Sequence, residues 1–162
     1  MAEARPIPVE VQLHAGPFDP LALLAGPPHG PRPGGWCGAL GLEAPAAEAH
    51  FIGRVRGTAA AGGPLEALEL EHYPGMTERQ LQALAQACAA RHGVAAVLVA
   101  HRVGRARPGE ALVLVAVAAD RRGPAQRCGG ELLEALKHEA PFWKREWSGG
   151  VGTWVEGNTL LG

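Results

Sequence analysis

The 162-residue sequence predicts an α+β fold with a mainly antiparallel sheet. Apolar residues alternate, or run without interruption, over several segments of strand length, whereas two longer segments carry them at helical spacing. The turn between the two most apolar segments is short, so these strands are expected to pair antiparallel. An apolar fraction of 47% and a charged fraction of 19% indicate a single folded domain over residues 1–162.

The N-terminal segment is expected to form a strand and a short helix. Apolar side chains alternate over residues 7–13. Asp19 as N-cap and Pro20 at the first helical position predict a helix over residues 21–25. Residues 26–35 then contain four prolines and four glycines, which predicts a surface excursion.

Three strands are expected in the next part of the chain, at residues 37–42, 50–56 and 65–73. The loop between the last two is rich in glycine and alanine and follows directly after Arg54 and Arg56. This loop suits either a lid or partner-binding edge beside a basic strand end, or an ordinary hairpin connection.

A helix is predicted after the Pro74–Gly75 turn. Thr77 and Gln80 are interpreted as its capping box, and Gly93 as the residue that ends it. Its apolar face is expected to consist of Leu81, Leu84, Ala85 and Cys88.

The remaining elements are two buried strands at 94–103 and 111–119, a helix that ends near Glu139, and a last short strand at 151–156. Gly129–Gly130 inside the helix predicts close packing against another backbone, because each glycine costs about 1 kcal/mol relative to alanine. The apolar face of this helix is expected to hold Ala125, Cys128, Leu132, Leu133 and Leu136.

Composition excludes several classes of function. Cys37, Cys88 and Cys128 lack CxxC spacing, and the seven histidines show neither HxH nor HxxxH spacing, so no disulfide framework or metal site is indicated. A net charge of −1 does not favour nucleic acid as a partner. No apolar run reaches the length of a membrane span and no signal pattern is present, so a cytoplasmic location is expected.

The two lysines are the most informative residues. The other basic residues are thirteen arginines (15 − 2 = 13). Arginine replaces lysine where a solvated charge is enough, but not where an amine must lose its proton or attack a carbon. Lys137 and Lys144, seven residues apart, therefore suggest amine chemistry, although a coding bias toward arginine would leave the same pattern.

The residues around the lysines predict a corner at which both amines could converge. Pro141 should end the helix, which leaves Lys137 in its last turn and Lys144 on an extended segment. Phe142 and Trp143 could wall this site and lower a lysine pKa, or could pack as ordinary core. Each arginine at an element end, taken alone, is better explained as a solvated surface charge.

Several motifs carry a resemblance to a known family. Over residues 50–156 the chain resembles the large, catalytic subunit of molybdopterin synthase, whereas residues 1–49 diverge from it. The motifs that carry the resemblance are Leu70–Glu78, His101–Gly104 followed by Pro108–Glu110, and Ala140–Glu146.

The resemblance implies an α/β-hammerhead-like fold with an added small antiparallel subdomain. It also implies a homodimer that docks one small ubiquitin-like sulfur carrier at each end. The carrier's C-terminal Gly-Gly thiocarboxylate would pass sulfur to cyclic pyranopterin monophosphate, an anionic pterin phosphate, forming the dithiolene of molybdopterin. The transfer needs no metal or organic cofactor, nucleic acid or membrane.

By the same resemblance, Lys137 and Lys144 match the catalytic lysines. The substrate-binding set is Arg54, Val55, Arg56, Arg121, Arg122, Arg145 and Glu146. The arginine pair at 121–122 is expected to face the partner protomer's pocket. Three departures stand out: Arg121 replaces the usual histidine, Gln126 a usual phenylalanine, and Asn158 a C-terminal arginine of some relatives.

Two other functions remain open from the sequence. One is a non-catalytic scaffold that binds a ubiquitin-like partner. The other, argued from the lysines alone, is a Schiff-base enzyme that acts on a phosphorylated carbonyl compound.

Overall fold

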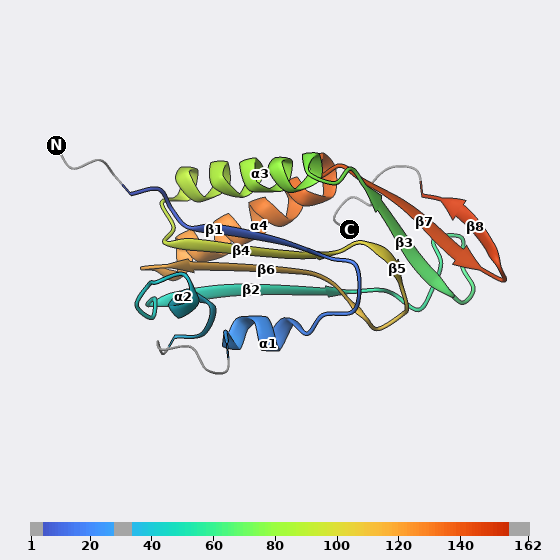
Figure 1. Ribbon diagram of the computed structural model, residues 1–162, viewed down its shortest axis with the longest axis horizontal. Coiled ribbons are helices and arrows are strands. Elements are labelled where there is room, and N and C mark those ends of the chain that lie inside the picture. The colour runs from blue at the N-terminus through green and yellow to red at the C-terminus, as the bar shows by residue number, and fades with distance from the viewer. Residues whose placement is uncertain (1–4, 28–33, 156–162) are drawn as a thin grey trace.

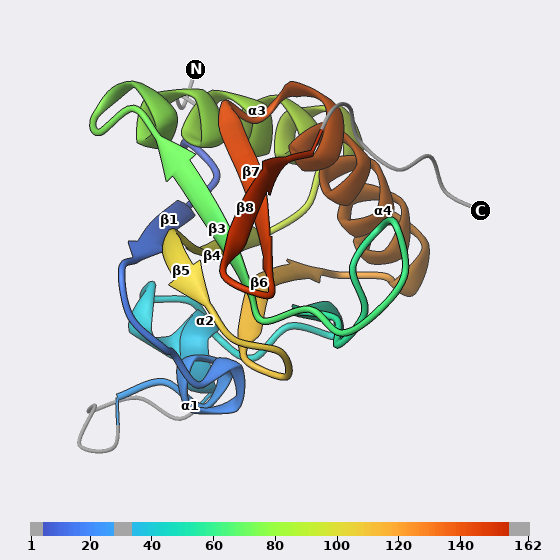
Figure 2. The ribbon, with the colours of Figure 1, turned by 90° about the vertical axis from the view of Figure 1, so that its right-hand side faces the viewer.

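The structure, a computed structural model, describes residues 5–27 and 34–155 and contains two four-stranded sheets. Helices α3 and α4 cover one face of the first sheet, and α1 and α2 lie on the other (Figures 1 and 2). The elements in chain order are β1 (Val9–His14), α1 (Pro20–Ala25), α2 (Gly35–Ala39), β2 (Ala47–Arg54), β3 (Ala67–His72), α3 (Met76–His92), β4 (Ala96–Arg102), β5 (Gly104–Ala106), β6 (Ala111–Ala119), α4 (Arg122–Glu139), β7 (Phe142–Ser148) and β8 (Val151–Trp154).

The first sheet has the strand order β1-β4-β6-β2. Strands β4 and β6 pair antiparallel, as predicted, and β2 pairs antiparallel with β6, while β1 runs parallel to β4. Nearly every residue of β4 and β6 is buried because helices cover both faces, which explains their uninterrupted apolar sequences.

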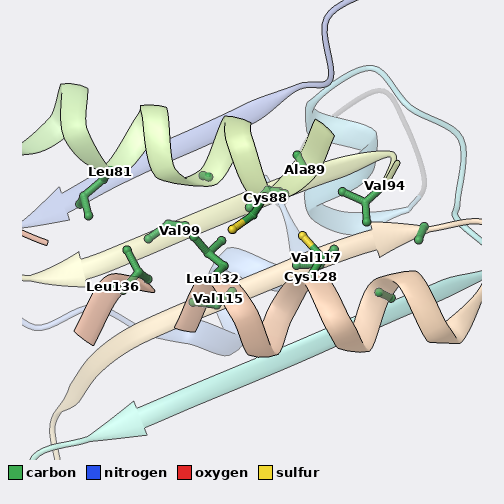
Figure 3. Close-up of a cluster of buried hydrophobic side chains, with 14 of the residues drawn as sticks. Leu81, Cys88, Ala89, Val94, Val99, Val115, Val117, Cys128, Leu132 and Leu136 are labelled. Atoms are coloured by element: carbon green, nitrogen blue, oxygen red, sulfur yellow. The ribbon is translucent and has the colours of Figure 1, made fainter. Parts of the chain in front are cut away.

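The main core lies between this sheet and helices α3 and α4 (Figure 3). Cys88 of α3 and Cys128 of α4 point toward each other inside it, and both are free thiols. Burial raises the pKa of the Cys128 thiol to about 12. The interpretation of these two cysteines as small core residues is confirmed.

The second sheet has the order β5-β3-β7-β8, is antiparallel throughout, and lies at one end of the first sheet (Figure 1). It confirms the α+β class with a small additional antiparallel sheet. Strand β5 was not predicted, because its three residues lie beside a turn and are too few to show alternation. Strand β8 confirms the last predicted strand from Val151 to Trp154, whereas Val155 lies outside the strand and Glu156 outside the described residues.

Three local predictions are wrong. Residues 37–42 do not form a strand, because residues 35–39 form helix α2 and the Leu40 N–H bonds back to the Trp36 and Cys37 carbonyls, as helical backbone does. Neither Gly129 nor Gly130 of α4 makes the predicted close contact with another backbone. A Cβ at Gly129 would meet only side chains at 3.8 Å, and one at Gly130 would meet nothing within 4 Å.

The predicted capping box of α3 is also wrong. The helix begins at Met76, and Gly75 at its N-cap has a φ of 84°, which favours glycine. The Glu78 carboxylate accepts the Gly75 N–H. Thr77 lies inside the helix, where its hydroxyl oxygen accepts the Tyr73 N–H at 3.0 Å. Gly93 ends the helix as predicted.

Helix α3 also protects the edge of the first sheet. Strand β1 is an edge strand, and α3 directs two glutamine side chains at carbonyl groups of β1 and of the segment just before it. Gln82 Nε2 donates to the Val9 carbonyl at 3.2 Å, and Gln86 Nε2 donates to the Ile7 carbonyl at 3.1 Å. These bonds satisfy backbone acceptors that an edge strand otherwise leaves to solvent or to another chain.

None of the helices in the described ranges is long and apolar enough to cross a bilayer.

Candidate active site

The two lysines lie at the junction of the two sheets. Helix α4 ends at Glu139 and Ala140 is extended, as Pro141 predicts, so Lys137 is in the last helical turn. Lys144 is on β7, opposite the buried Leu70 of β3. Burial, and then the positive charge of Lys137, lower the pKa of Lys144. The fold therefore brings the two amines close enough to influence each other.

A buried histidine adjoins Lys144. His101, at the end of β4, is 7% exposed and stacks on Phe142 with ring centroids 4.2 Å apart. Its Nδ1 lies 2.8 Å from the Arg102 carbonyl, which can only accept, so Nδ1 carries the proton. Burial above all, and also the charge of Lys144, lower the pKa of His101 to about 4, although the hydrogen bond with the Arg102 carbonyl acts in the opposite direction. The imidazole is therefore neutral at pH 7.

Phe142 and Trp143 differ in their surroundings. Phe142 packs against the main core as well as His101, whereas Trp143 is 44% exposed and meets Tyr73 edge-to-face at 4.9 Å. Phe142 thus combines the roles of wall and core residue. His101 was not among the predicted site residues, although its position in the His101–Gly104 motif was the signal available.

The basic residues at the end of β2 lie at the same end of the first sheet as His101, because Arg54 pairs with Ala111 and His101 with Val113 on β6. Arg54 and Arg56 are exposed, and neither forms an ion pair with any residue in the described ranges. Both guanidinium groups are therefore available to an anion.

Val55, between these arginines, is only 4% exposed. Its N–H donates to the Glu110 carbonyl at 3.0 Å, and its carbonyl accepts the Gly109 N–H at 2.8 Å. Buried Arg102 holds the same turn by donating to the Glu110 carboxylate at 2.9 Å and to the Arg105 carbonyl at 2.6 Å. The structure gives Val55 a supporting position, and its predicted contact with substrate stays a prediction.

Arg145 faces away from Lys144, since neighbouring residues of a strand project to opposite faces. Its Nε donates to Glu69 at 3.0 Å, and its guanidinium lies over the rings of Trp147 and Trp154 at 5.0 and 4.7 Å. Glu146 projects to the Lys144 face, where its carboxylate accepts the Ala60 N–H at 3.0 Å. Both side chains thus already have partners within the chain.

Arg121 and Arg122 lie at the opposite end of α4 from Lys137 (Figure 1). Fifteen residues of helix separate Arg122 from Lys137, about 22 Å at 1.5 Å per residue. Both arginines are exposed, and Arg121 makes only a 3.9 Å contact with Asp120. One chain does not bring them to the lysines, so their predicted contribution requires a second protomer.

Two further features lie away from the lysines. A hollow of about 330 Å³ opens between β1 and helices α1 and α2, lined by Glu10, Gln12 and Trp36 among others. Gln126, a departure noted in the sequence, is exposed on α4, so this departure costs no core packing. Asn158 lies outside the described residues. Among those that are described, no group of three or more histidine, cysteine, aspartate or glutamate side chains is placed to hold a metal ion.

The fold and this cluster define an α+β protein with a cationic site that bears two amines. The model of the MoaE family, described as MoaE protein, matches residues 41–139. The molybdopterin synthase catalytic subunit of Ralstonia nicotianae is 46% identical over 110 residues, which is 68% of this chain and 62% of that protein. The chain belongs to the MoaE family, a family of enzyme subunits.

Solved structures agree with this assignment. The molybdopterin biosynthesis MoaE protein from Burkholderia ambifaria superposes with a TM-score of 0.67 at 32% identity, over 94% of this chain and 91% of that one. The match therefore extends into the divergent N-terminal part. A complex of subunits 1 and 2 of the molybdopterin-converting factor from Helicobacter pylori matches with a TM-score of 0.68 over 90% of both chains, and at 20% identity it shows the shared fold alone.

Proposed function

We propose that this chain is the catalytic subunit of a molybdopterin synthase and passes sulfur from a small ubiquitin-like carrier to cyclic pyranopterin monophosphate. The observation that carries this proposal is the half-buried Lys144 amine, whose pKa is lowered by burial and by Lys137. A lowered pKa raises the fraction of neutral amine, the form that accepts a proton or attacks a carbonyl carbon. Arginine, which stays charged, offers neither reaction.

The charges of the site suit the proposed reactants. Thiocarboxylate, cyclic phosphate and the oxyanions that develop during transfer are all negative, and a fixed cationic site stabilises them without reorganisation. Arg54 and Arg56 are exposed at the same end of the first sheet as His101, which adjoins Lys144. They are the groups proposed to hold the phosphate, by charge-assisted hydrogen bonds.

Each transfer requires one substitution at a pterin carbon and one at the carrier's terminal carbon. The thiocarboxylate sulfur first bonds to a carbon of the pterin precursor and displaces an oxygen substituent from that carbon, which leaves as a phosphate oxygen or as water, so that a thioester joins carrier and pterin. The carbon–sulfur bond to the carrier then breaks when water or a lysine amine adds to the acyl carbon, which leaves the carrier as carboxylate or amide and the sulfur on the pterin. Lys137 and Lys144 would hold the acyl oxygen and move the protons, and two such transfers complete the dithiolene.

The partners belong to the same proposal. A small subunit with a C-terminal Gly-Gly is expected to dock with its tail at the lysines, and the chain is expected to form a homodimer. A cytoplasmic location also stays a prediction. No metal or cofactor is required by the proposed chemistry.

Reconstitution tests the proposed function directly. The chain, a thiocarboxylated small subunit and the precursor should together yield molybdopterin, detected by conversion to a fluorescent pterin. Docking of the carrier without any product would instead indicate a non-catalytic scaffold. Borohydride trapping of a carbonyl substrate on either lysine would indicate a Schiff-base enzyme.

A further inference from the structure

Glu146 is an acidic residue at a site built for anions. It is two residues from Lys144 on β7, so both side chains project from the same face of the strand. A carboxylate repels a phosphate, which argues against direct contact with the proposed substrate. Its observed partner is instead the loop between Gly57 and Pro64, where the Ala60 N–H donates to its two oxygens at 3.3 and 3.0 Å. The two residues are 86 positions apart in the sequence.

This loop is a compact hairpin. The Leu65 N–H donates to the Gly57 carbonyl at 2.9 Å, and the Ala59 N–H donates to the Gly63 carbonyl at 3.0 Å. A bridge between Thr58 and Pro64 closes it further. The loop closes on itself, but β2 and β3 on either side of it belong to different sheets, so it is not the ordinary hairpin connection considered for this segment.

Strand β7 holds the hairpin at two points. Besides Glu146, the Ser148 hydroxyl donates to the Pro64 carbonyl at 3.1 Å. The Glu66 N–H, just after the hairpin, donates to the Trp147 carbonyl at 2.7 Å. Three successive residues of the strand that carries Lys144 therefore form hydrogen bonds with the hairpin or with the residue that follows it.

Arg56 lies directly before this hairpin. On its N-terminal side, Val55 is buried and both its backbone polar groups are paired with the turn at residues 109–110. On its C-terminal side, Gly57 closes the base of the hairpin. The backbone of Arg56 is therefore set by two anchors, of which one belongs to the hairpin that Glu146 contacts at Ala60.

We infer that Glu146 is a positioning residue: by holding the 57–64 hairpin against β7, it fixes Arg56 relative to Lys144. The inference rests on the proposed function only in giving Arg56 a substrate to bind. Glu146 thus shapes the anion site through the hairpin and does not itself contact the anion.

Amide hydrogen exchange on the free chain tests the contact without any substrate. Glu146→Ala should speed exchange at Ala60 about tenfold, the lower end expected for loss of a charge-assisted hydrogen bond. Glu146→Gln, which keeps one carbonyl acceptor, should show a smaller increase. Glu43→Ala, which removes an exposed carboxylate between α2 and β2, serves as the matched control and should leave Ala60 unchanged.

Unchanged Ala60 exchange in Glu146→Ala, with β4 and β6 still protected, would overturn the inference. If Glu146→Ala fails to fold, Glu146→Gln decides, since unaltered exchange at Ala60 in that variant has the same meaning.

A double-mutant cycle separates positioning from a general structural role. Glu146→Ala should raise the KM for cyclic pyranopterin monophosphate about tenfold and change kcat much less. In an Arg56→Ala background the same substitution should leave KM nearly unaltered, because the residue it positions is gone. Fully additive effects would contradict action through Arg56. A wild-type chain without any sulfur transfer would refute the proposed function, while the exchange experiment would still decide the contact.

Discussion

Lys144 illustrates how position changes what one residue can do. On an exposed surface it would be a permanent cation, but beside Leu70 and near Lys137 its pKa falls, first because of burial and then because of the second amine. The neutral form becomes accessible nearer to physiological pH. Under the proposed function, an amine with a lowered pKa explains why a chain that otherwise uses arginine has two lysines at this corner.

His101 provides a residue-scale prediction about stability and pH. Its pKa is about 4 in the folded chain against an ordinary value of 6.5. Between these values the unfolded chain binds a proton that the native chain does not, so native stability falls as the pH drops from about 6.5 to about 4. The loss attributable to this group is roughly 3 kcal/mol at 1.36 kcal/mol per pKa unit.

The measurement is urea unfolding of the wild type and His101→Phe between pH 7 and pH 4. The variant should be less stable at pH 7, because the Arg102 carbonyl loses its donor. The gap should narrow by roughly 3 kcal/mol toward pH 4. A gap that stays constant over this range would show that His101 is not buried in its neutral form.

At this scale the sequence predicts the positions of the site residues better than their surroundings. Lys137 in a last helical turn and Lys144 on a strand follow from Pro141, as the structure confirms. Strand alternation predicts that the Arg145 side chain projects from the face of the strand opposite to the face that carries Lys144. The partners of Glu146 and His101 could not be predicted, because they come from residues 86 and 41 positions away along the chain.

At the scale of elements, the clearest feature is the pair of side-chain hydrogen bonds from α3 to the edge of the first sheet formed by β1 and the residues just before it. Gln82→Ala and Gln86→Ala should each lower the free energy of unfolding by about 1 kcal/mol, because the first leaves the Val9 carbonyl and the second the Ile7 carbonyl without its side-chain donor. Gln80→Ala, an exposed position on the same helix, is the control for the change in helix propensity. Equal stability of all three variants would show that these two hydrogen bonds contribute nothing measurable.

The predictions of strands and helices were correct where the spacing of apolar residues along the sequence was regular. Uninterrupted apolar runs predicted β4 and β6, and helical spacing predicted α3 and α4. Helix α2 was missed because five residues give too short a window, and its burial comes from tertiary packing. Strand β5 was missed because its three residues are also too few to show a pattern.

At the scale of the whole molecule, α4 separates Arg122 from Lys137 by about 22 Å. If both serve one site, that site is completed by a second protomer. Chains carrying Lys137→Ala and Arg122→Ala should then complement each other, because a mixed dimer contains one site with both wild-type residues. After random exchange of subunits, about a quarter of the wild-type sulfur-transfer activity should return.

Each variant alone supplies the control for this experiment, since neither homodimer has an intact site. No recovery on mixing, with exchange verified by light scattering and mass labels, would place Arg122 outside the lysine site. A chain that stays monomeric at micromolar concentration would contradict the shared site altogether.

The central claim is that the site needs amines rather than only positive charge. Single-turnover conversion of the precursor by Lys137→Arg and Lys144→Arg, each with thiocarboxylated partner, tests it most directly. Both variants keep the charge but lose the group that can give up a proton, so each rate should fall on the order of a hundredfold or more. Lys137→Arg should be the more damaging, because the helix end restricts repositioning of its side chain. Near-normal rates for Lys137→Arg would contradict the catalytic amine and leave a purely electrostatic pocket.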